Sequence, residues 1–99
     1  MSFESLDQYL LTGSPRKADV VSALLADRSP APAASAFYEG MRLLGPRTPD
    51  LTLIALRLVV AGKRADDASV VELRELTQRA RDGDAAARQT YLERVRWNG

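Results

Sequence analysis

The sequence predicts an all-α fold, a compact single-domain bundle of five or six short helices with a central buried helix near 49–61. Alanine and leucine dominate the composition and β-branched residues are few, which favours helices. Glycines and hydroxyl–proline pairs recur where helices would begin and end. The most apolar run also lies between helix start and stop signals. A chain of 99 residues fits one helical domain over 1–99.

The first third of the chain predicts two helices. The first covers about 3–11, has an apolar side that includes Leu6 and Leu10, and ends before Gly13. The second begins at the pair Ser14-Pro15, in which the serine would cap the helix and the proline would occupy its first turn.

A third helix is predicted from Pro32 to about Leu44. Phe37, Met41 and Leu44 recur at helical spacing, so we expect them to face inward. Gly40 lies inside this helix, at a cost of about 1 kcal/mol relative to alanine. We expect close approach by another helix to compensate for that cost.

The central helix is predicted from the apolar run 51–61, which has Arg57 in its middle. A membrane crossing needs about 20 apolar residues, so this run is too short and is interrupted by a charge. A buried strand is the remaining alternative. Thr48 as a cap, Pro49 at the first helical position and Gly62 at the end favour a helix instead.

Two more helices complete the prediction. Asp66 or Asp67 caps the fifth, which runs to about Arg81. Gly83 then ends it and Asp84 caps the sixth. The short connection between them predicts an antiparallel hairpin.

The stretch "RARDGDAAARQTYLERVR", residues 79–96, resembles the opening helical hairpin of extracytoplasmic-function sigma factors. The resemblance covers about a fifth of the chain. The remainder has no identifiable promoter-reading region, so the resemblance implies a helical hairpin and assigns no residue a role.

Catalytic and metal chemistry find little support in the composition. The chain has no cysteine and no histidine, which removes the usual zinc, haem and iron–sulfur ligands and the imidazole base. Asp66 and Asp67 are adjacent and point in different directions on a helix. We therefore predict no enzyme, no catalytic residue, no cofactor and no metal site.

The charge and the first residues bear on location. The net charge is +1, from 14 basic and 13 acidic residues, which is no polyanion-binding signature by itself. The start, "MSFESLDQYL", lacks the basic and apolar regions of a secretory signal. The expectation is a cytoplasmic protein without a membrane anchor.

The function predicted is that of a small non-catalytic protein-protein interaction protein, meaning a regulator, an inhibitor or a subunit of a larger complex. Its partner would be another protein, and self-association stays open. The region 42–64 holds only Asp50 against five basic residues. Arginine suits bidentate contacts with carboxylates and phosphates. The candidate partner- or phosphate-binding residues are Arg42, Arg47, Lys63, Arg64, Arg94 and Arg96.

The alternative is a nucleic-acid-contacting subunit that binds the phosphate backbone through this Arg-rich face. Base reading by a helix-turn-helix is disfavoured, because the second helix of that pair would be the apolar central one. Tyr9, Tyr38 and Trp97 are open to two interpretations, as exposed anchors for a partner or as core residues.

Overall fold

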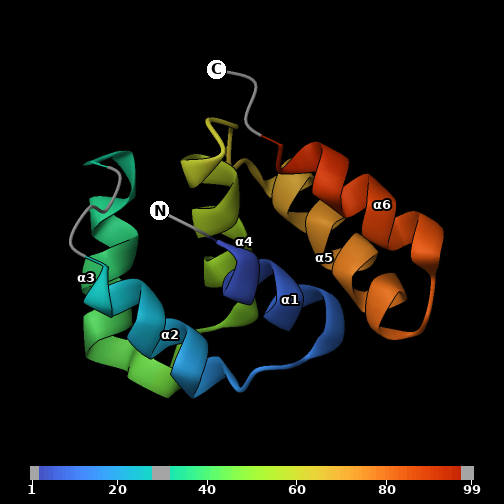
Figure 1. The fold of residues 1–99 in the computed structure, drawn as a ribbon. Helices are drawn as coiled ribbons and strands as arrows, with labels where there is room; N and C mark the ends of the chain where they lie inside the picture. The colour runs from blue at the N-terminus through green and yellow to red at the C-terminus, as the bar shows by residue number, and fades with distance from the viewer. Residues whose placement is uncertain (1–2, 28–31, 97–99) are drawn as a thin grey trace.

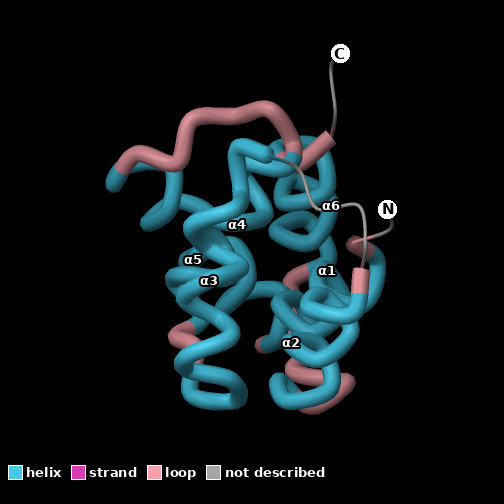
Figure 2. Tube along the Cα trace, turned by 90° about the vertical axis from the view of Figure 1, so that its left-hand side faces the viewer, coloured by secondary structure: helices cyan, strands magenta, loops and turns pink. Residues whose placement is uncertain are grey.

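The computed structural model describes residues 3–27 and 32–96. Every regular element in these ranges is a helix (Figure 2). The α-helices are α1 (Glu4–Thr12), α2 (Lys17–Ala26), α3 (Ser35–Leu44), α4 (Asp50–Val60), α5 (Asp67–Arg81) and α6 (Ala85–Arg94). Two 3-10 turns, η1 (Pro32–Ala34) and η2 (Gly45–Arg47), flank α3. The predicted all-α bundle is confirmed.

The helices are arranged around α4 and α1 (Figure 1). The helix α1 packs against α2, α4 and α5, and α4 also packs against α5 and η1. The pair α5 and α6 forms the predicted hairpin along one side of the molecule (Figure 1). On the opposite side, α3 contacts α2 and the two 3-10 turns, so it lies at the edge of the bundle (Figure 1).

The centre of the core is α4, as predicted. Leu53 and Leu56 are completely buried, and Ile54 and Leu58 expose 3% or less of their surface. Burial of one such side chain stabilises the fold by about 1.5–3 kcal/mol, so this short helix owes its stability to its neighbours. Within the described ranges no helix is long and apolar enough to cross a bilayer.

The caps predicted for the last two helices are confirmed. The Asp66 carboxylate accepts a hydrogen bond from the Ser69 backbone N–H at 2.8 Å, and Asp84 accepts one from Ala87 at 3.1 Å. These backbone bonds are the main reason why the pKa values of both aspartates are lowered. Arg79 donates a further bond to Asp84 at 2.8 Å, which ties the end of α5 to the start of α6.

The hydroxyl–proline pairs begin helices differently from the prediction. Thr48 does not cap α4: its hydroxyl donates to the Gly45 carbonyl at 2.7 Å and so closes η2. Pro49 is the N-cap residue of α4 and not its first helical residue, so the helix begins at Asp50, one residue later than predicted. The helix α2 begins at Lys17, two residues after Pro15. Pro15 and Pro49 thus precede their helices and do not stand in the first turns.

Two predictions for α3 are wrong. Apart from its chain neighbours and the backbone of α3 itself, no described atom lies within 4 Å of where a Gly40 side chain would begin, so no other helix of this part of the chain approaches it. Leu44 exposes 42% of its surface and does not face inward. The cause is the position of α3 at the edge of the bundle, where only one of its sides is covered.

Some predicted features lie outside the described residues. They are the proposed packing of Trp97 and the serine–proline pair at residues 29 and 30. Of the other aromatic residues considered, Tyr9 and Tyr38 expose 8% and 3% of their surface. Both therefore belong to the core and are not exposed anchors.

Candidate functional site

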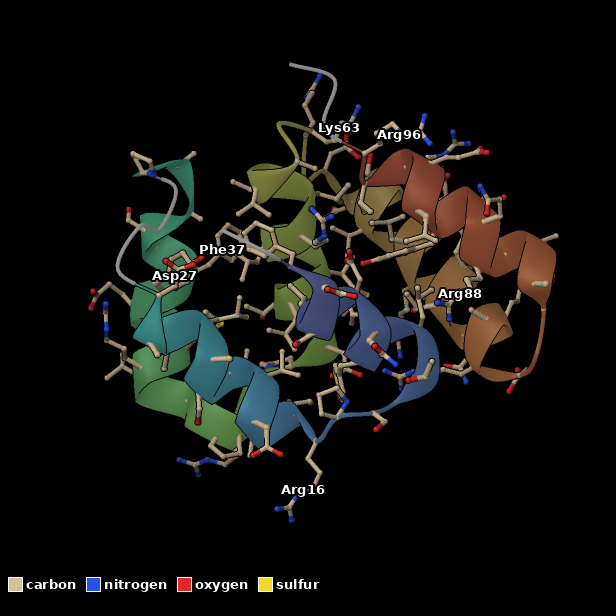
Figure 3. The ribbon with its side chains drawn as sticks, in the orientation of Figure 1. Arg16, Asp27, Phe37, Lys63, Arg88 and Arg96 are labelled. Atoms are coloured by element: carbon tan, nitrogen blue, oxygen red, sulfur yellow. The ribbon has the colours of Figure 1, made fainter. Side chains whose placement is uncertain are left out.

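The predicted Arg-rich residues divide into two groups at opposite ends of α4. Arg42 and Arg47 precede this helix, whereas Lys63, Arg64, Arg94 and Arg96 lie near its C-terminal end. Figure 3 shows Lys63 and Arg96 together at that end. The 11 residues of α4 span about 16 Å, so the structure builds no single basic face from all six.

Three residues of the group at the C-terminal end of α4, Lys63, Arg64 and Arg94, line a pocket of about 510 Å³. Three acidic residues line the same pocket: Asp66, Glu72 and Glu93. Arg94 donates to the Glu72 carboxylate at 2.5 Å, and this hydrogen bond is the main reason why its pKa is raised. The pocket is balanced in charge, which disfavours dedicated binding of a polyanion.

The other two candidates lie at the C-terminal end of α3. The Arg42 guanidinium forms an ion pair with Glu39, one turn earlier on the same helix. Arg47 is exposed in η2 and forms no ion pair with any residue of the ranges 3–27 and 32–96. Arg47 therefore adds an uncompensated positive charge at this end of the helix.

A first polar cluster, partly buried, joins α1, α4 and α6. Arg57 binds both Asp7 carboxylate oxygens, at 2.7 and 3.2 Å, and Tyr91 donates to the same carboxylate at 2.7 Å. The Arg57 guanidinium also lies over the Phe3 ring, 5.2 Å from its centroid. Burial, reinforced by the Asp7 charge, raises the pKa of Tyr91 far above its ordinary value. The charge inside the apolar run is thus neutralised within the fold.

A second cluster centres on Asp50 at the start of α4. Tyr9 donates to its carboxylate at 2.9 Å, and the Lys17 ammonium lies 2.8 Å away. Burial opposes ionisation of Asp50, but the bonds from Lys17 and Tyr9 outweigh it and lower the pKa of this carboxyl. Arg81 donates to the Tyr9 and Leu10 carbonyls at 3.0 and 2.9 Å, which satisfies groups at the end of α1.

Both clusters have structural roles. Each carboxylate in them is held by several donors that come from other helices or connections, so the clusters tie together parts of the chain that are distant in the sequence. No group of three or more potential metal ligands is found in the described part of the chain. The sequence shows Arg57 in the middle of an apolar run but does not indicate that Asp7 and Tyr91 are the residues that join it.

Within the described ranges, the large hydrophobic residue with the greatest exposed fraction lies on α3. Ala36, Gly40, Leu43 and Leu44 follow the spacing i, i+4, i+7 and i+8, which places them on one side of the helix. We call these four residues the α3 outer face. Leu43 exposes 83% of its surface, the largest fraction among the exposed large hydrophobic residues. The opposite side of α3 contributes Tyr38 and Met41 to the core.

The sequence contained a signal for this face that was not recognised. The helix α3 carries two apolar stripes, and a helix at the edge of a bundle can bury only one of them. Comparison of the chain with protein-family models, curated proteins and solved structures finds no match. A proposal for the function therefore rests on the described surface.

Proposed function

We propose that this protein is a small non-catalytic protein-binding module that docks on its partner through the α3 outer face. The observation that carries this proposal is the exposure of Leu43, at 83%, and of Leu44, at 42%, which lie at the two edges of one broad face of a single helix. Single exposed leucines are common on protein surfaces, but an ordered apolar stripe on a helix is typical of a binding surface.

The composition of this region fits a protein interface. Interfaces combine an apolar centre with a polar rim in which arginine is frequent. Leu43 and Leu44 supply the centre, and Arg42 and Arg47 lie beside it. Burying Leu43 against a partner would contribute about 1.5–2.5 kcal/mol, which corresponds to roughly a 10- to 70-fold effect on affinity.

The bonding of Asp7 and Asp50 supports a binding role over a catalytic one, because both carboxylates join parts of the fold. Asp7 and Asp50 are each held by an arginine or a lysine and by a tyrosine hydroxyl. These groups connect helices that are distant in the sequence. We further propose that the protein acts in the cytoplasm, as a regulator, an inhibitor or a subunit of a larger complex.

Site-specific photo-crosslinking tests the binding surface. A photoreactive amino acid replaces Leu43 in one variant and Val71 in the other, because Val71 is also apolar and exposed, at 52%, but lies on α5. Both variants are irradiated in cells of the source organism. We expect a discrete adduct with another protein from position 43 and not from position 71. Equal adducts from both positions, or none from position 43, would refute the proposal.

A second candidate function is contact with a nucleic-acid backbone at the C-terminal end of α4. Lys63, Arg64 and Arg96 lie at that end, and none of them forms an ion pair with a described residue. A gel-shift assay between 50 and 200 mM salt tests it, since phosphate binding weakens steeply over that range. The absence of a shift at low salt, or an unchanged shift for Arg64→Glu, would eliminate this candidate.

A further inference from the structure

The charges around the α3 outer face restrict what can cover it. Glu39 and Arg42 form an ion pair with each other and therefore offer little net charge to a partner. Arg47 follows Leu44 by three residues, is exposed, and forms no ion pair within the described part of the chain. Because η2 follows α3 directly, a partner that covers the two leucines and extends past the C-terminal end of α3 would bring its own side chains near Arg47. An acidic side chain would be attracted at that position and a basic one repelled.

The size of the face indicates a helix as the covering element. Its four residues lie along about two turns of one helix, far fewer than the 20–30 residues a side of a stable protein interface. The absence of any described atom within 4 Å of the position of a Gly40 side chain leaves room for close approach of another backbone. An amphipathic helix laid along the face would bury the two leucines and occupy this space.

A second copy of this chain satisfies these requirements poorly. Antiparallel pairing of two α3 helices, with Leu43 over Gly40 of the other copy, would place Arg47 opposite Ala36. Parallel pairing would instead bring the two copies of Arg47 together. Neither arrangement places an acid directly opposite Arg47, and Glu39 already forms an ion pair with Arg42. The charges therefore favour a different protein.

We infer that the occupant of the α3 outer face is an amphipathic helix of another protein, with an apolar stripe toward Leu43 and Leu44 and an acidic side chain toward Arg47. This inference rests on the proposed function, because it specifies the chemistry of the partner at the same surface. It adds a requirement for acidity that the proposed function does not contain.

Selection from a displayed library of amphipathic helices tests the requirement for acidity. The library keeps an apolar stripe constant and varies the residues at both ends of the stripe among Glu, Gln and Lys. The full-length protein is the bait, in its wild-type form and as Arg47→Glu, Leu43→Ala and Arg88→Glu. Arg88 is a matched control, because it is an exposed arginine on α6, on the other side of the molecule (Figure 3).

We expect the wild type and the Arg88→Glu variant to select Glu over Lys, with binders that lose about two- to fivefold in affinity when Glu is replaced by Lys. The Arg47→Glu variant should select Lys, and Leu43→Ala should enrich neither. Binding that depends on Leu43 but shows no change of preference with Arg47→Glu would overturn this inference and leave the proposed function intact. No binding that depends on Leu43 would overturn both.

Discussion

Removal of Asp7 is expected to destabilise the fold strongly, because this carboxylate neutralises Arg57, the charge inside the apolar run of the central helix. Arg57 and Asp7 expose just 13% and 16% of their side chains. In Asp7→Ala, the guanidinium loses two hydrogen bonds and its counter-ion, and the Tyr91 hydroxyl loses its acceptor. Breaking a buried pair costs about 3–5 kcal/mol, and the residual exposure here reduces that to about 2–4 kcal/mol.

This loss would be a large part of the total stability. A domain of this size has an unfolding free energy of about 5–15 kcal/mol, and each 1 kcal/mol shifts its Tm by about 4–8 °C. We therefore expect the Tm of Asp7→Ala to fall by about 10–25 °C. Replacing Arg57 by methionine in the same chain should restore much of the loss, because no buried charge is then left without a partner.

Urea denaturation of the wild type, both single variants and the double variant measures the coupling between Asp7 and Arg57. We expect about 1–3 kcal/mol at pH 7. The matched control is the pair Arg16 and Asp19, whose side chains are 89% and 64% exposed and which should show no measurable coupling. If Asp7→Ala unfolds at the wild-type urea concentration, the assignment of this cluster to the stability of the core is wrong.

Three further predictions concern ionisation and glycine. Because the pKa of Tyr91 is raised, its contribution to the unfolding free energy is complete below pH 10 and is lost as the pH rises further. The urea midpoint should therefore fall above pH 10, and it should fall less steeply in Tyr91→Phe. The lowered pKa of Asp50 has the opposite consequence: the contribution of this carboxylate to the unfolding free energy is complete well above its ordinary pKa of 3.8 and is lost on acidification. The acid-induced loss of stability, followed by circular dichroism, should therefore be shallower in Asp50→Asn. Gly40→Ala should raise the unfolding free energy by about 0.5–1 kcal/mol, because the added methyl meets open space. Gly13→Ala should lower it by about 1–2 kcal/mol, because Gly13 has a φ of +84°, and a thermal melt that ranks the two variants the other way would contradict both backbone assignments.

The parts of the fold that depend on neighbouring residues were predictable from the sequence. Helical spacing located all six helices to within a few residues. Asp66 and Asp84 cap their helices as predicted, because a cap and the N–H that it accepts are only three residues apart. Thr48 is the exception, since its hydroxyl had a competing acceptor in the preceding 3-10 turn.

The burial of α4 and the hairpin of α5 and α6 were predictable, but the specific partners and the uncovered surfaces of the fold were not. Asp7 and Arg57 are 50 residues apart in the sequence, and many acids were equally plausible partners for Arg57. The clustering of basic residues between 42 and 64 suggested one basic face, but the length of α4 separates that cluster into two groups. The α3 outer face was not predicted, because a helix with two apolar stripes does not indicate which stripe its neighbours cover.

The uncovered outer face of α3 is tested most directly by NMR of leucine methyl groups in the presence of a soluble paramagnetic agent. Broadening by such an agent reports the exposure of each methyl group to solvent. We expect Leu43 to be broadened most among the leucines of the described ranges, and the fully buried Leu53 and Leu56 least. Broadening of Leu43 as weak as that of Leu53 would show that this face is covered in the isolated protein and would contradict its assignment as a free docking surface.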